Sequence, residues 1–127
     1  MYMARITVKM GECISTEGGN SLFTTGLSDC VAIALVAASG RKVMYHITGA
    51  NGEYASYFYR LNDAAAAGVR KMIIIYGTIN GEYGRVMFKN QDLVRNLIDI
   101  AGEDNLIELQ SNSVEVYPNG SYALGIE

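Results

Sequence analysis

The chain has 127 residues, of which half are hydrophobic and 18% are charged, with a formal net charge of −3. This size and composition predict a single folded domain spanning residues 1–127. The weak negative charge and the lack of a Lys/Arg cluster argue against a nucleic-acid partner. No apolar run reaches the roughly 18 residues of a membrane span, so we expect no membrane insertion. The N-terminus alternates like a strand and does not resemble a signal peptide, which predicts a cytosolic protein or one delivered without a cleaved signal.

The predicted elements form a strand-rich α+β domain with about two helices packed on sheets. Apolar residues at helical spacing and the alanine-rich run "DAAAAG" predict the first helix. We expect Asn90 to cap the second helix and Gly102 to end it. Hydrophobic alternation and turn residues place the remaining elements. In chain order, we expect strands over 5–10, 22–25, 31–37 and 42–48, a helix over 54–71, a strand over 72–77, a helix over 91–101 and closing strands over 106–110, 113–118 and 121–127.

The sequence contains no metal-site or nucleotide-site pattern. Two cysteines, Cys13 and Cys30, and a single histidine, His46, fall short of the four ligands of a structural zinc site. The segment "GTINGEYG" has glycines that do not fit G-x-G-x-x-G, and no Gly-Lys-Ser/Thr follows them. We therefore expect neither a metal nor a cofactor.

Cys30 and His46 lie on two strands that the sequence predicts to form a hairpin. In an antiparallel pair, the numbers of opposed residues add to a constant, which is 76 if Cys30 faces His46. A loop of residues 37–39, or one of residues 36–40, gives this register, and Gly40 suits the left-handed position of such loops. Opposed residues share a face, with Cβ atoms about 4.5–5.5 Å apart. The register therefore predicts a Cys–His pair.

Such a pair makes a nucleophile. A free thiol, with a pKa near about 8.5, is mostly protonated at neutral pH, and an adjacent imidazole can take its proton. A third group must hold the other ring nitrogen, for which Thr24 and Thr25 are candidates. The turn before the strand, with Ser28, Asp29 and Cys30, can direct backbone N–H groups at a developing oxyanion.

The stretch from Thr24 to Cys30, T-x-x-L-S-D-C, resembles T-x-x-L-S-G-C of the cytotoxic necrotizing factor-type and Burkholderia lethal factor-type toxins. It is also similar to T-x-x-L-G-S-C of the chemotaxis receptor deamidases (CheD). In these families a catalytic histidine ends the strand after the nucleophilic cysteine, as His46 does here. The specific motif covers Thr24 to His46, and the order of elements matches from about Leu22 onwards.

The resemblance implies a β-sandwich-like core of mixed or antiparallel sheets flanked by helices. It implies a Cys-His-Thr triad in which Cys30 is the nucleophile, His46 the base and then the acid, and Thr24 the group that orients His46. The expected reaction is cofactor-independent hydrolysis of a surface glutamine of a protein substrate to glutamate and ammonia through a thioester; some members also transfer the acyl group to amines. The expected location is a bacterial cytoplasm or the cytosol of a target cell.

Two departures separate the sequence from these families. Asp29 stands where they have a small residue, and a carboxylate facing the sulfur would disfavour the thiolate, so we expect its side chain to point away. Gly77 is followed by Thr78, where the receptor deamidases have a second glycine, which favours a toxin-like or effector-like member. The alternatives are a non-catalytic binding or regulatory domain, in which Asp29 marks a decayed site, and a structural domain with a core cysteine. Cys13 is expected to be a spectator.

Overall fold

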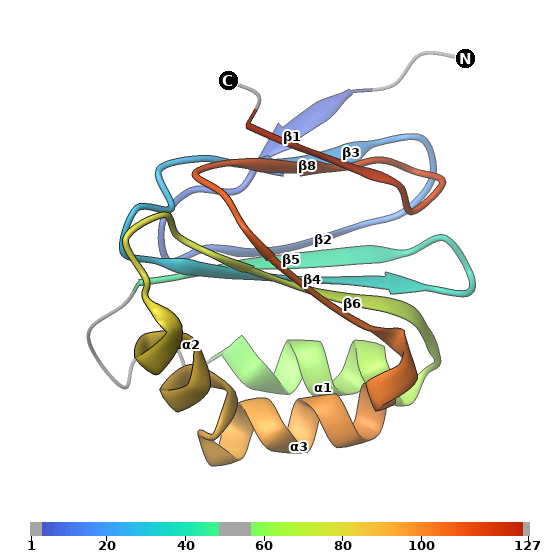
Figure 1. The fold of residues 1–127 in the computed structure, drawn as a ribbon. Coiled ribbons are helices and arrows are strands. Elements are labelled where there is room, and N and C mark those ends of the chain that lie inside the picture. Colours follow the sequence, from blue (N-terminus) through green and yellow to red (C-terminus); the bar gives the residue numbers. More distant parts are fainter. Residues whose placement is uncertain (1–3, 49–56, 126–127) are drawn as a thin grey trace.

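The protein folds into three layers, two β-sheets and one layer of helices (Figure 1). The structure, a computed structural model, describes residues 4–48 and 57–125. A four-stranded sheet packs on one face of a five-stranded sheet, and the helices cover the other face of the five-stranded sheet. The predicted α+β fold with a β-sandwich-like core is confirmed.

Both sheets are mixed. All neighbouring strands are antiparallel except the pairs β1–β3 and β6–β7. The four-stranded sheet has the order β1 (Arg5–Thr7), β3 (Ser21–Thr24), β8 (Val114–Val116) and β9 (Tyr122–Leu124). The five-stranded sheet has the order β2 (Cys13–Thr16), β5 (Lys42–Ile47), β4 (Val31–Ala37), β6 (Val69–Tyr76) and β7 (Leu106–Gln110). The helices are α1 (Phe58–Ala66), α2 (Glu82–Lys89) and α3 (Asp92–Ala101), followed by a 3-10 turn, Glu103–Asn105.

The central strand β4 divides the core into two layers. Its alternate side chains Ile33 and Leu35 face the helices, while Ala32, Ala34 and Val36 face the other sheet. Because both faces are covered, every residue of β4 is buried, which explains its unbroken apolar sequence. The small alanines leave room on the inter-sheet face for the side chains of the opposing sheet.

The first helix is shorter than predicted. It ends at Ala66, and Gly68, with φ of 110°, turns the chain into β6, so that Arg70 and Lys71 belong to a strand. The predicted start near Tyr54 lies outside the described residues. Gly68, which follows the alanine-rich run, thus separates the helix from the strand. The apolar residues after Gly68 belong to β6.

Two further elements differ from the prediction. Helix α2 occupies Glu82–Lys89, where we expected a loop, and strand β2 was not expected. Asn90 does not cap the next helix; it ends α2, and Gln91 is the N-cap residue of α3. Tyr83, Val86 and Met87 follow the i, i+3, i+4 spacing of a helix, but the glycines Gly81 and Gly84 in this polar segment led us to expect a loop.

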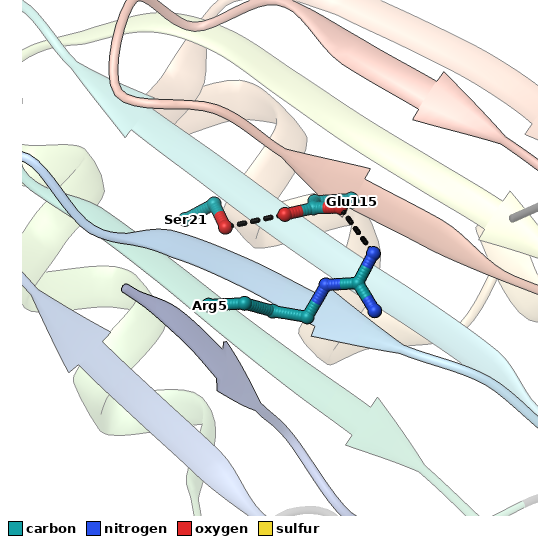
Figure 2. A network of polar contacts seen from close by, with 3 residues as sticks. All are labelled: Arg5, Ser21 and Glu115. Atoms are coloured by element: carbon teal, nitrogen blue, oxygen red, sulfur yellow. Dashed lines mark hydrogen bonds and ion pairs between the residues drawn. The ribbon is translucent and has the colours of Figure 1, made fainter. Parts of the chain in front are cut away.

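A charged network lies on the outer face of the four-stranded sheet (Figure 2). Glu115 Oε1 accepts a hydrogen bond from Arg5 Nη2 at 2.8 Å, and Glu115 Oε2 accepts one from Ser21 Oγ at 2.5 Å. Burial would raise the pKa of Glu115, but the hydrogen bonds from Arg5 and Ser21 outweigh it and hold this pKa below its ordinary value. Each carboxylate oxygen is therefore partnered.

Candidate active site

The residues expected to form a triad come from three strand ends that border the inter-sheet layer. Thr24 is the last residue of β3, Cys30 lies directly before β4, and His46 is the penultimate residue of β5. All three are buried, and Cys30 packs in the cluster between the two sheets. Sheet topology thus brings together side chains that are up to 22 residues apart in the chain.

The hairpin register differs from the prediction. His46 pairs with Ala32, not with Cys30, so the numbers of paired residues add to 78. The chain turns later than expected: Ala37 N–H still donates to Arg41 O, and Gly40, with φ of 94°, closes the turn. Cys30 therefore lies diagonally from His46 on the same face. The Cα atoms of diagonal neighbours in an antiparallel pair are about 7–8 Å apart.

Thr24 fixes the orientation of the imidazole. Its hydroxyl lies 2.7 Å from His46 Nδ1 and donates to the Val8 carbonyl oxygen at 2.6 Å. A hydroxyl has a single proton. Because Thr24 donates this proton to the Val8 carbonyl oxygen, its own oxygen must accept the hydrogen bond from His46 Nδ1–H. The neutral ring then carries its proton on Nδ1, and Nε2 presents a lone pair.

Nε2 of His46 is the atom available for proton transfer. It is buried and has no hydrogen-bond partner within the described part of the chain. Burial lowers the pKa of His46 below its ordinary value, and the Asp29 carboxylate opposes this to a lesser degree. The ring is therefore a neutral base at neutral pH, as a histidine that accepts a proton must be.

The thiol of Cys30 contacts Asp29. Cys30 Sγ lies 3.6 Å from Asp29 Oδ1 with donor geometry. Our expectation that Asp29 points away from the sulfur is wrong: at the end of the turn, before β4 begins, no strand alternation forces the two side chains apart. Because Nε2 has no partner, the predicted hydrogen bond between Cys30 and His46 is not made in this structure.

A second segment, residues 77–80, holds the cysteine turn in place. Gly77 N–H and Asn80 Nδ2 both donate to the Cys30 carbonyl oxygen, at 2.9 and 3.1 Å, and Ile79 N–H donates to Ser28 O at 2.9 Å. A Cβ on Gly77 would overlap the carbonyl oxygen of Leu27, so only glycine fits there. Sequence reasoning considered this stretch only as a phosphate loop and as a site of paired glycines, and did not identify its contacts with the turn.

Gln110, at the end of β7, supports this segment from behind. Its Nε2 donates to the carbonyl oxygens of Asn80 at 2.7 Å and Gly77 at 3.1 Å, and lies 3.4 Å from that of Thr78. Nothing in the sequence signalled this contact, because it joins residues about 30 positions apart on neighbouring parallel strands. Gln110 thus connects the turn to the sheet.

The turn offers two of the three backbone N–H groups expected at an oxyanion site. Cys30 N–H donates to Leu27 O at 3.2 Å, which closes the turn and removes this group from the expected set. The N–H groups of Ser28 and Asp29 make no hydrogen bond to any residue that the structure describes. Both residues are exposed, so these two N–H groups are the candidates to bind a substrate oxygen.

Neither Cys30 nor His46 is open to solvent. Cys30 is 2% exposed and His46 1%. A cavity of about 210 Å³ lies beside them, lined by Asp29 and by Asn80 but by neither Cys30 nor His46. A substrate therefore reaches the sulfur only if the turn shifts.

Cys13 lies on the opposite face of the five-stranded sheet from Cys30. It packs in the helix-facing layer, and both cysteines are free thiols. Burial raises the pKa of Cys13 to about 11, against a smaller opposing effect of Arg60. A thiol with this pKa is protonated at neutral pH and is a poor nucleophile.

Neither a metal centre nor a membrane-spanning helix is present in the described parts of the chain. No group of three or more His, Cys, Asp or Glu side chains there is placed to hold a metal ion. No described helix has both the length and the apolar character needed to cross a bilayer. No protein-family model matches the sequence, and comparison with curated proteins also gives no match.

Proposed function

We propose that the protein is a cysteine-dependent protein-glutamine deamidase of the toxin-like or effector-like kind, working in a bacterial or target-cell cytosol. One observation carries the proposal: Thr24 holds His46 as a neutral imidazole whose unpartnered Nε2 borders the layer that contains the Cys30 thiol. Burying a polar atom without a partner is unfavourable, and this atom shares a face of the five-stranded sheet with the Cys30 thiol, which supports a chemical role.

The proposed reaction begins with transfer of the thiol proton from Cys30 Sγ to His46 Nε2. The thiolate attacks the side-chain carbonyl carbon of a substrate glutamine, and the resulting oxyanion accepts hydrogen bonds from the N–H groups of Ser28 and Asp29. The C–N bond then breaks, and the nitrogen leaves as ammonia with the proton from Nε2. A thioester on Cys30 remains.

Water completes the cycle. His46 Nε2 removes a proton from the attacking water, the C–S bond breaks, and the proton returns to the sulfur as glutamate is released. Before the first step, the Cys30 thiol must exchange its contact with Asp29 for one with Nε2. Hydrogen bonds of this kind tighten when substrate binds, so a loose arrangement in the free protein is compatible with the proposal.

The test combines thiol reactivity with product analysis. Incubating the protein with bacterial or host lysate is expected to convert specific glutamines to glutamates, detected by mass spectrometry. Cys30→Ala and His46→Leu should abolish the conversion, while Cys13→Ser should retain it. A lysate in which wild-type protein and Cys30→Ala produce the same peptides would contradict the proposal.

A second candidate function, a non-catalytic binding or regulatory domain, is favoured by the contact of Asp29 with the thiol and by the burial of Cys30. The two functions predict different alkylation rates at about pH 6, where an ordinary thiol is almost wholly protonated. The enzyme predicts rapid iodoacetamide labelling of Cys30 that His46→Leu slows. The regulatory domain predicts slow labelling that the same substitution does not change.

A further inference from the structure

The cavity beside the cysteine turn has a single charged group, Asp29, among its described lining residues. It lies between the helix-facing side of the five-stranded sheet and α2, with a volume of about 210 Å³. Its walls are apolar and polar in nearly equal measure, and the described polar residues are neutral apart from Asp29. The described lining residues are Asp29, Val31, Ile47, Thr48, Tyr76, Asn80, Gly84, Met87, Phe88 and Gln91.

This composition suits one chemical class of occupant. A cavity that has apolar side chains in its walls, one carboxylate and no cation among its described residues matches a side chain with an aliphatic stem and a cationic end, as lysine and arginine have. The volume is below the range of about 300–1,000 Å³ typical of pockets for whole small-molecule ligands, and is appropriate to one side chain. An acidic occupant would meet like charge at Asp29.

Asp29 connects the cavity to the reacting sulfur. Asp29 lines the cavity, and its carboxylate oxygen Oδ1 lies 3.6 Å from Cys30 Sγ. A cation seated in the cavity would pair with this carboxylate and reduce its repulsion of the thiolate. The thiol would then lose its acceptor at Asp29 and become available to His46 Nε2.

Exposed apolar side chains occur at and next to residues that line the cavity, since Ile79 and Tyr83 adjoin the lining residues Asn80 and Gly84 in the chain. Ile79 is 71% exposed, Tyr83 78% and Met87 53%. Met87 lines the cavity, and Ile79 is hydrogen-bonded through its backbone to Ser28 of the turn. Apolar groups exposed together beside a site are typical of a surface that contacts another protein, so the basic side chain would arrive as part of a protein substrate.

We propose that this cavity binds a lysine or arginine side chain that neighbours the target glutamine, and that its pairing with Asp29 releases the Cys30 thiol for reaction. The proposal rests on the proposed deamidase function and adds the substrate class and a specificity-determining residue. It also gives the family departure at Asp29 a role: pairing of Asp29 with a basic substrate raises the reactivity of the thiol above its level in the free protein.

The first test compares matched glutamine peptides that carry lysine, norleucine or glutamate next to the glutamine. Wild-type protein should show kcat/KM at least about fivefold higher for the lysine peptide than for the norleucine peptide. Asp29→Asn should bring this ratio close to one, and Asp29→Lys should favour the glutamate peptide. Asp63→Asn, which removes an exposed carboxylate of α1 outside the cavity, should leave the ratio unchanged.

Gly84→Leu provides a second variant that leaves the charge of Asp29 in place. It fills the cavity from α2, where a Cβ meets only Asn80 Oδ1 at 3.8 Å, and should remove the preference for lysine. A wild-type ratio near one, or a ratio that survives both Asp29→Asn and Gly84→Leu, would overturn the proposal.

The second test measures binding without catalysis. Titration with n-pentylammonium should shift the backbone amide signals of the cavity residues in NMR spectra, with n-pentanol as the neutral control. We expect binding of the cation at least about fivefold tighter than that of the alcohol, and Asp29→Asn should remove the difference. Equal binding of the two probes, or no binding, would contradict the assignment of the cavity.

The two tests separate the possible failures. Cation binding that depends on Asp29, together with the absence of deamidation of any peptide, would support the proposed cation-binding cavity and contradict the proposed deamidase activity. Deamidation without a preference for a basic neighbour would support the proposed deamidase activity and contradict the proposed cation-binding cavity.

Discussion

The two polar networks on opposite sides of the four-stranded sheet differ in whether each polar atom has a hydrogen-bond partner. On the outer face, both carboxylate oxygens of Glu115 are partnered, by Arg5 and by Ser21 (Figure 2). On the inner face, His46 has one ring nitrogen bound to Thr24 and the other without a partner among the described residues. A satisfied network stabilises a fold, whereas a buried nitrogen without a partner lowers its stability.

The largest effect on stability is expected from breaking the contacts of Gly77 with the cysteine turn. Gly77→Ala places a Cβ onto the carbonyl oxygen of Leu27 and within 2.6 Å of that of Ser28, both backbone atoms. We expect a loss of at least about 3 kcal/mol in the free energy of unfolding, measured with urea. Gly84→Ala is the control, since its Cβ meets only ordinary contact and alanine favours a helix by up to about 1 kcal/mol. Equal effects of the two substitutions would show that the turn does not rest on Gly77.

A paired substitution tests the comparison directly. Glu115→Leu leaves the buried Ser21 hydroxyl without its acceptor and should lower the free energy of unfolding by about 1–3 kcal/mol. His46→Leu removes an unpartnered nitrogen, and Thr24 keeps its hydrogen bond to Val8, so stability should change by less than about 1 kcal/mol while the proposed activity is lost. The measurement is urea unfolding, and a larger loss for His46→Leu would reverse our interpretation of the two networks.

Thr24→Val tests how the imidazole is oriented. It leaves His46 Nδ1–H and the Val8 carbonyl oxygen without the hydroxyl and should cost about 1–2 kcal/mol of the free energy of unfolding. The 15N chemical shifts of the ring should show that the proton no longer stays on Nδ1, and alkylation of Cys30 should slow. Thr7→Val, at an exposed position of β1, is the control and should change none of these.

The smallest effect concerns pH. Burial lowers the pKa of His46 in the folded protein, so between this pKa and the unfolded value near 6.5 the unfolded chain binds more protons. The free energy of unfolding should therefore fall as pH drops below about 6.5, and His46→Leu should flatten this slope. His46 is the chain's only histidine, so a single imidazole signal in 1H NMR spectra reports its titration. A midpoint above 6.5 would contradict the burial argument.

Local sequence patterns predicted the strands that carry the site, because β4 and β5 are long, apolar and bounded by turn residues. They also placed Thr24 among the candidates to contact His46, since it ends the strand before the cysteine turn. The register was missed by two residues because the length of a hairpin loop is decided by packing against both sheets, which alternation alone does not report.

Long-range contacts account for what the sequence could not predict. The hydrogen bonds that hold the cysteine turn come from residues 77–80, about 50 positions away, and are supported in turn by Gln110. The side-chain direction of Asp29 was misjudged because it precedes the regular strand, where backbone pairing no longer dictates which face a residue takes. Neither feature leaves a periodic pattern in the sequence.

The hairpin β4–β5 places a polar residue near each end of the same face, His46 at one end and Lys42 at the other, with Met44 between them. Lys42 Nζ reaches the carbonyl oxygens of Gly40 at 3.2 Å and Gly18 at 3.5 Å. If the strand slipped by one residue during folding, both groups would enter the apolar layer beneath the helices and lose these partners. A misaligned hairpin would therefore bury the imidazole and the amine without partners, which favours the native register.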